Sequence, residues 1–341
     1  MTCKLMFQQF EPAIRKCFGH AIDDAGEAAR DIKLDIHENA LRPGLKAEFA
    51  ALPEKDDRIV RVTWNGFATL WSACQGFARL ANAMHQGMQQ GQERLDVASG
   101  SELQIGLNFL TASMWFRAND MPSDGKAHWI DALPSPSANP TDQSSVAGNR
   151  LFIGALAWIF RHEIAHITLG HIVSTASDPI AQEKQADDQA ADWLRGNRLA
   201  DQSRPVGSPV AEEELELEQR AMAIVLGTVW IATFEIGARQ PSAVHPPVAD
   251  RISKTLDRFS LREDSAALLI AANCISVLID PQGQWSTREQ PYQNSLEYLQ
   301  DAVRRLQHYM LDLTHQQPWH KPSLDSGHRP ATSTKPASDE P

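Results

Sequence analysis

The spacing of apolar residues along the first third of the chain predicts a mixture of strands and helix. Residues 58–64, RIVRVTW, are rich in β-branched side chains and nearly alternate, which predicts a strand. Residues 66–92 carry apolar side chains at helical spacing and predict a helix. In ELQIGLNFL, residues 102–110, every second residue is apolar, and this alternation predicts a further strand. We therefore expect an N-terminal α+β region over residues 1–130.

The rest of the chain reads as a loop, a long region of helices and a polar tail. Residues 131–149 include LPSPSANPTDQSSVAGN, a composition typical of a loop. All of the candidate chemistry lies within residues 150–260, and residues 261–314 look helical. Residues 315–341 are polar and rich in proline, which predicts a disordered tail.

Composition narrows the class of protein. The 341 residues are 42% hydrophobic and 22% charged, as in a globular protein, and the net charge of −11 argues against binding to nucleic acid. The longest apolar run, residues 221–234, is shorter than the roughly 20 residues that cross a bilayer, so we expect a core helix and no membrane span. The N-terminus lacks the apolar region of a signal peptide, and the four cysteines form no CxxC pair. These features predict reduced thiols in a cytoplasmic protein.

The first candidate metal-binding and catalytic segment is LFIGALAWIFRHEIAHITLGH, residues 151–171, which contains an HExxH motif. This segment predicts one helix, apolar almost all round in its first half and therefore buried. His162 and His166 are four residues apart, so their imidazoles share a face and can converge on one ion. Glu163 lies about 100° around the axis, where it can take a proton from a water activated by a metal. The alternative is that both histidines are satisfied core residues or an exposed pair.

His171 is a tempting additional ligand. It follows His162 by nine residues, which places it about 180° around a continuous helix. We therefore expect a histidine at the helix end that is either structural or in contact with a metal-binding residue, and that does not bind the metal itself.

A second helix is expected within residues 177–196, SDPIAQEKQADDQAADWLRG. Asp178 fits the N-cap, Pro179 the first helical position and Gly196 the stop.

Two carboxylates of this helix, Glu183 and Asp187, are four residues apart and share a face. Glu183 can supply the third, oxygen ligand of a zinc site with two histidines. Asp187 can accept the other N–H of a ligating histidine. The alternative for Glu183 is a solvated helical charge.

A third segment, residues 242–256, SAVHPPVADRISKTL, predicts a loop that enters a helix. His245 can donate a hydrogen bond to the oxyanion that forms when water attacks a carbonyl. Arg251 can assist it, can hold the carboxylates of the site, or is a surface charge. The acidic run EEELELE, residues 212–218, is either a mobile flap or the solvated start of a helix at 216–236 packed behind the site.

Together these segments resemble the gluzincin metallopeptidases. HEIAH at 162–166, EKQAD at 183–187 and HPPVADR at 245–251 are similar to the HExxH, ExxAD and HPxxxxR signatures of the HtpX and CAAX-prenyl-protease type. They are also similar to the soluble phage-exclusion peptidases of the Lit type, which share a buried HExxH helix ending in LGH. HtpX-type enzymes are embedded in membranes and have a third ligand further from HExxH. Both departures favour the Lit type.

The resemblance implies an α+β, mainly helical fold in which a zincin-like active-site helix packs on a small sheet. Residues 150–260 would be the catalytic core. His162, His166 and Glu183 would bind Zn²⁺.

The resemblance also implies roles for the other motif residues. Glu163 would be the general base and Asp187 would orient a histidine. His245 and Arg251 would lie near the transition state. The expected function is a zinc-dependent endopeptidase acting on a protein or peptide, in phage defence or a stress response. In the Lit type that response is bacterial suicide, with a host translation factor as the target. The peptide would lie extended against a sheet edge, for which the strand at 103–110 is the candidate. The alternative is a non-catalytic metal-binding protein of a regulatory or toxin-antitoxin-like kind.

Overall fold

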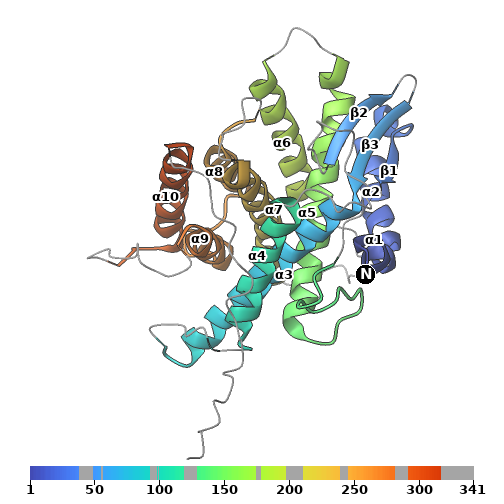
Figure 1. Ribbon diagram of the computed structural model, residues 1–341. Coiled ribbons are helices and arrows are strands. Elements are labelled where there is room, and N and C mark those ends of the chain that lie inside the picture. Colours follow the sequence, from blue (N-terminus) through green and yellow to red (C-terminus); the bar gives the residue numbers. More distant parts are fainter. Residues whose placement is uncertain are drawn as a thin grey trace, which may run out of the picture.

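The computed structural model describes residues 1–37, 49–54, 57–92, 98, 100–118, 129–173, 178–196, 210–238, 245–280 and 291–315. These residues form a mainly helical α+β fold with a small sheet, as expected (Figure 1). Buried hydrophobic residues form one continuous core that runs from Cys3 near the N-terminus to Leu306 in the last helix.

The N-terminal part contains α1 (Cys3–Phe7), α2 (Glu11–Ala25), β1 (Lys33–His37), β2 (Phe49–Glu54), β3 (Asp57–Thr63), α3 (Trp64–Gln89) and α4 (Glu102–Ala118), with short 3₁₀ turns η1 (Gln8–Phe10) and η2 (Glu27–Ala29). The remainder contains α5 (Gln143–Thr168), the 3₁₀ turn η3 (His171–Val173), α6 (Pro179–Gly196), α7 (Val210–Ala238), α8 (Val248–Phe259), α9 (Ala266–Ile279) and α10 (Ser295–His315).

The sheet has the strand order β1-β3-β2. β3 matches the strand expected at 58–64 and lies in the centre, parallel to β1 and antiparallel to β2. Within the described residues β2 pairs with β3 alone, which leaves its other side as an edge of the sheet. This edge lies beside α5 (Figure 1).

The strand expected at 102–110 is wrong, because these residues begin helix α4. The apolar residues of this segment fit both periods, since Leu103, Leu107 and Leu110 also follow helical spacing. Two glycines let α4 pack closely on α3: a Cβ on Gly76 would lie 2.7 Å from Leu110 Cγ, and one on Gly106 would lie 3.0 Å from the Gly76 carbonyl oxygen. Tertiary packing of the two helices therefore decides between the two patterns.

Helix α5 is the centre of the fold and contacts α2, α3, α6, α7 and β2 (Figure 1). It begins at Gln143, so the loop expected over 131–149 ends seven residues early. Asp142 is the N-cap, with its Oδ1 accepting a hydrogen bond from the Ser145 N–H over 2.8 Å. Asp142 therefore caps a helix, and the Ser and Asn residues that suggested a loop lie in its first turns.

The other expected helices are present. The segments 66–92, 177–196 and 216–236 correspond to α3, α6 and α7, and residues 261–314 contain α9 and α10. The acidic run 212–218 lies in the first turns of α7, as the helix-start alternative expects. The expected disordered tail lies outside the described residues, apart from His315 at the end of α10.

Two further expectations concern membranes and thiols. Among the described helices, none combines the length and apolar content needed to cross a bilayer. All four cysteines are free and buried, and burial raises the pKa of each thiol, to about 12 for Cys3 and Cys17.

Candidate metal centre

Three side chains from two helices meet at the centre of the fold. His162 Nε2 lies 3.0 Å from His166 Nε2 and 3.3 Å from Glu183 Oε2, and His166 Nε2 lies 3.2 Å from Glu183 Oε1. Zinc bonds of about 2.0–2.1 Å in a tetrahedral arrangement place ligand atoms roughly 3.3 Å apart. The donor types and their separations therefore fit a zinc ion with two histidines and one carboxylate.

The local sequence explains how α5 and α6 bring these groups together. The four-residue spacing places both histidines on one face of α5. Gly170 ends the last turn of α5 with φ +71°, a left-handed conformation that glycine adopts without strain. Three alanines of α6 are buried, Ala186, Ala190 and Ala191, together with Asp187 and Leu194. Helix α6 packs against α5, and Glu183 reaches both histidines from it.

The cluster stabilises positive charge. Burial alone would lower the pKa of His162, but its hydrogen bonds with Asp187 and Glu183 raise that pKa to about 10. Burial would raise the pKa of Glu183, but the three imidazoles around it hold that pKa well below its usual range. The site thus keeps a proton on His162 and a negative charge on Glu183. A divalent cation could take the place of that proton.

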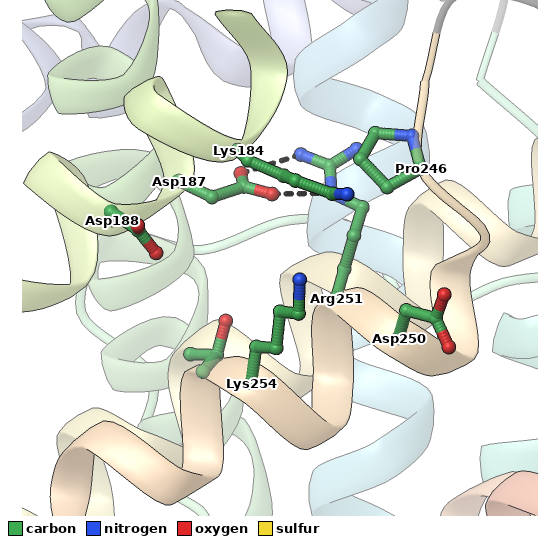
Figure 2. Close-up of a pocket in the computed structure, with 8 residues that line it drawn as sticks. Lys184, Asp187, Asp188, Pro246, Asp250, Arg251 and Lys254 are labelled. Carbon is green, nitrogen blue, oxygen red and sulfur yellow. Dashed lines mark hydrogen bonds and ion pairs between the residues drawn. The ribbon is translucent and has the colours of Figure 1, made fainter. Parts of the chain in front are cut away.

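Asp187 supports His162 from the other side of its ring. His162 Nδ1 lies 2.9 Å from Asp187 Oδ1, and Arg251 donates to both oxygens of the same carboxylate, over 2.8 Å from Nε and 2.7 Å from Nη2 (Figure 2). Burial would raise the pKa of Asp187, but the charge of Arg251 and the bond to His162 lower it. Asp187 occupies the expected position beside a candidate metal-binding histidine, and Arg251 holds a carboxylate of the site, one of its expected roles.

His171 contacts the other nitrogen of the second histidine. Its Nδ1 lies 3.1 Å from His166 Nδ1, and its Nε2 lies 3.0 Å from Gln185 Oε1. It does not belong to the group of convergent ligand atoms found in the described residues. This placement matches the second alternative, contact with a candidate metal-binding residue, and Gln185 is a contact that the sequence pattern did not indicate.

His245 reaches the site from the loop before α8. Its Nδ1 lies 2.9 Å from Glu183 Oε2, and its side chain is 41% exposed, whereas that of Glu183 is 12% exposed. His245 therefore lies at the solvent side of the cluster.

Glu163 points to the sheet. Its Oε2 accepts a hydrogen bond of 2.7 Å from the backbone N–H of Ala51, in the middle of β2. In an antiparallel pair the backbone groups of successive residues alternate in direction along a strand. The backbone groups of Ala51 and Pro53 therefore both face away from β3. Proline lacks an N–H, and its place at an outward position is typical of an edge strand. The sheet edge beside α5 is thus β2, and the expected edge at 103–110 is wrong, because those residues form a helix.

A buried HExxH helix, a carboxylate from the next helix and a sheet edge beside the glutamate together are typical of metallopeptidases. Comparison with known proteins gives the family. The model of the Peptidase U49 family matches residues 60–272, more than half of the chain, and the chain belongs to this family. It is a peptidase, and the likeness to the Lit type is confirmed.

A bacterial peptidase is similar to most of this chain. The chain is 23% identical over 263 residues to the cell death peptidase of Escherichia coli K12. The matched region covers 74% of this chain and 82% of that protein. A search of solved structures gave no significant match.

Proposed function

We propose that this peptidase is a zinc-dependent endopeptidase and that His162, His166 and Glu183 hold the zinc. The convergence of their three ligand atoms, 3.0–3.3 Å apart, is the observation that carries the proposal. Nitrogen from two histidines and oxygen from one glutamate is a donor set that zinc uses in hydrolytic enzymes. Residues 150–260 would hold the catalytic groups, and Ala51 of β2 would complete the site.

The bound metal would supply the Lewis acid that makes water a nucleophile at neutral pH. Glu163 would take the proton of the attacking water and return it to the leaving amine. Asp187 would keep His162 oriented, and His245 would donate a hydrogen bond to the oxyanion, since it lies at the exposed side of the cluster. Arg251 would act through Asp187 and not on the substrate.

An extended peptide would pair with the outer edge of β2, mainly through its outward carbonyl groups, because the Ala51 N–H binds Glu163 and Pro53 has no N–H. Alternate residues of this strand direct their backbone groups away from β3, and an extended chain can hydrogen-bond to such groups. The Ala51 N–H places this edge beside Glu163, so the scissile bond of a paired peptide would lie close to the base.

The physiological setting is inferred from the relative and from the thiols. The curated relative is named a cell death peptidase, which supports a role in phage defence or a stress response. Four free, buried cysteines are typical of a reducing compartment and support the cytoplasm.

A glutamine at position 163 tests the proposal. The Glu163→Gln protein should bind one zinc per chain, as the wild type does, and should lose cleavage by about 10²–10⁴-fold. Both proteins would be incubated with a bacterial lysate, and new protein N-termini that appear with the wild type alone would identify the cleavage sites. Cleavage that survives in the Glu163→Gln protein would show that another group is the base. A wild type without stoichiometric zinc would rule out the metal centre.

A further inference from the structure

Trp158 lies one helical turn before His162 on α5, on the same side of the helix. It is the largest fully buried side chain among the described residues, at 1% exposed. No motif in the sequence marks it, because a tryptophan in an apolar helix is ordinarily core.

Trp158 belongs to a closed cycle of contacts that includes the candidate metal-binding histidine His162. The indole lies 5.9 Å from the His162 ring, centroid to centroid, and the Arg251 guanidinium carbon lies 5.7 Å from the indole centroid. Arg251 binds Asp187 through two hydrogen bonds, and Asp187 lies against His162 Nδ1. The cycle of contacts therefore runs from Trp158 through Arg251 and Asp187 to His162 and back to Trp158. It joins α5, α6 and α8.

The surroundings favour a specific role for this indole. Arg251 is 5% exposed, and a buried guanidinium gains from an aromatic face in addition to its carboxylate partner. A Cβ on Gly227 would lie 3.2 Å from Trp158 Cε3, so glycine at this place on α7 lets the helix pack against the indole. The indole N–H is buried and has no hydrogen-bond acceptor among the described residues. Phenylalanine would fill the core without that unsatisfied group, but tryptophan gives the strongest cation–π contact.

We propose that Trp158 is a positioning residue of the metal centre. Its ring holds the Arg251 guanidinium against Asp187 and fixes the His162 imidazole with Nε2 directed at the ligand cluster. The inference rests on the proposed zinc site and adds to it a support that acts through Arg251.

Zinc affinity of the metal-free, full-length protein tests this inference without a substrate. Zn²⁺ would be titrated in competition with a chromogenic chelator, and thermal unfolding of each metal-free variant would be recorded alongside. Trp158→Leu should weaken zinc binding by about 10- to 100-fold, as loss of a group supporting a ligand does. Trp158→Phe, which keeps a weaker π face, should give a smaller loss.

Phe160→Leu is the matched control. Phe160 is fully buried on the same helix, about 200° around the axis from Trp158, and its ring packs on Phe18. This variant should lose thermal stability and keep its zinc affinity within about twofold, as expected for an independent site. An equal loss of zinc affinity in Phe160→Leu would show a general packing effect and overturn the inference.

A double-variant cycle tests the route through Arg251. If Trp158 acts through the guanidinium, Trp158→Phe should weaken zinc binding less in an Arg251→Lys background than in the wild type. Should Trp158→Leu fail to fold, Trp158→Phe and this cycle decide the question. Wild-type zinc affinity in the Trp158 variants would overturn this inference alone, whereas a wild-type protein that binds no zinc would overturn the proposed function as well.

Discussion

The backbone N–H of Ala51 donates a hydrogen bond to the Glu163 carboxylate over 2.7 Å, although 112 residues separate them in the chain. The bond joins the edge strand of the sheet to the glutamate of the HExxH motif. In the proposed mechanism, it places the strand edge on which a peptide would pair next to the group that would move the proton.

Replacing Ala51 by proline should remove the donor and leave the strand intact. Pro53 already occupies an outward position two residues along β2, so the edge tolerates proline here. A hydrogen bond to a charged group contributes about 1.5–3 kcal/mol, so the rate of cleavage should fall by roughly 10- to 100-fold. The variant should keep its zinc content and circular dichroism spectrum. Ala51→Val, which retains the N–H, is the control, and equal activity of Ala51→Pro and wild type would rule out the contact as a determinant of activity.

Asp187→Asn should be strongly destabilising because it leaves Arg251 buried without its charged partner. Loss of one member of a buried ion pair costs about 3–5 kcal/mol. Chemical denaturation of the metal-free protein would measure this change, and zinc affinity should fall in parallel. The neighbouring Asp188 is a matched control, since its side chain is 45% exposed and pairs with Arg258 over 2.8 Å. Asp188→Asn should change the stability by less than about 1 kcal/mol, and similar losses in both variants would contradict the assigned roles.

The stability of the metal-free protein should have a maximum on the acidic side of neutrality. The pKa of His162 is raised from 6.5 to about 10, so its contribution is complete below about pH 6.5 and is lost as the pH rises towards 10. Glu183 and Asp187 have lowered pKa values, so their contributions are present above their ordinary values of 4.5 and 3.8 and are lost in acid. Denaturation midpoints measured from pH 4 to about 10 would record both the acid and the alkaline loss of stability. The alkaline decrease should be smaller in His162→Gln, and a flat wild-type profile above pH 6.5 would contradict the shift.

Removal of the metal should lower the thermal stability of the wild type. A ligand at 100 times its dissociation constant stabilises the folded state by about 2.7 kcal/mol. The unfolding midpoint measured with excess zinc should therefore exceed the midpoint in chelator by several degrees. In Glu183→Ala, which lacks one proposed ligand, the two midpoints should converge. Chelator that leaves the wild-type midpoint unchanged would contradict a structural effect of the metal.

The sequence predicted correctly those elements whose side-chain pattern is compatible with only one type of secondary structure. HExxH within a long apolar segment gives a buried helix with two histidines on one face, and the capping residues before Glu183 give the next helix. Residues 102–110 fit two periods, and the glycine-mediated contact of α3 and α4 selected the helix. Likewise Ser and Asn near 143 suit either a loop or a helix start, and the Asp142 cap made it a start.

The amino-acid sequence by itself determined the set of reactive groups, because imidazole and carboxylate chemistry and the four-residue repeat of a helix are local properties. Only the tertiary structure decided which of these groups touch. Arg251 binds Asp187, His245 reaches Glu183, and a backbone amide of β2 meets Glu163. Contacts of this kind join segments far apart in the chain, and they depend on how α5, α6, α8 and the sheet pack together, which no pattern within one segment encodes.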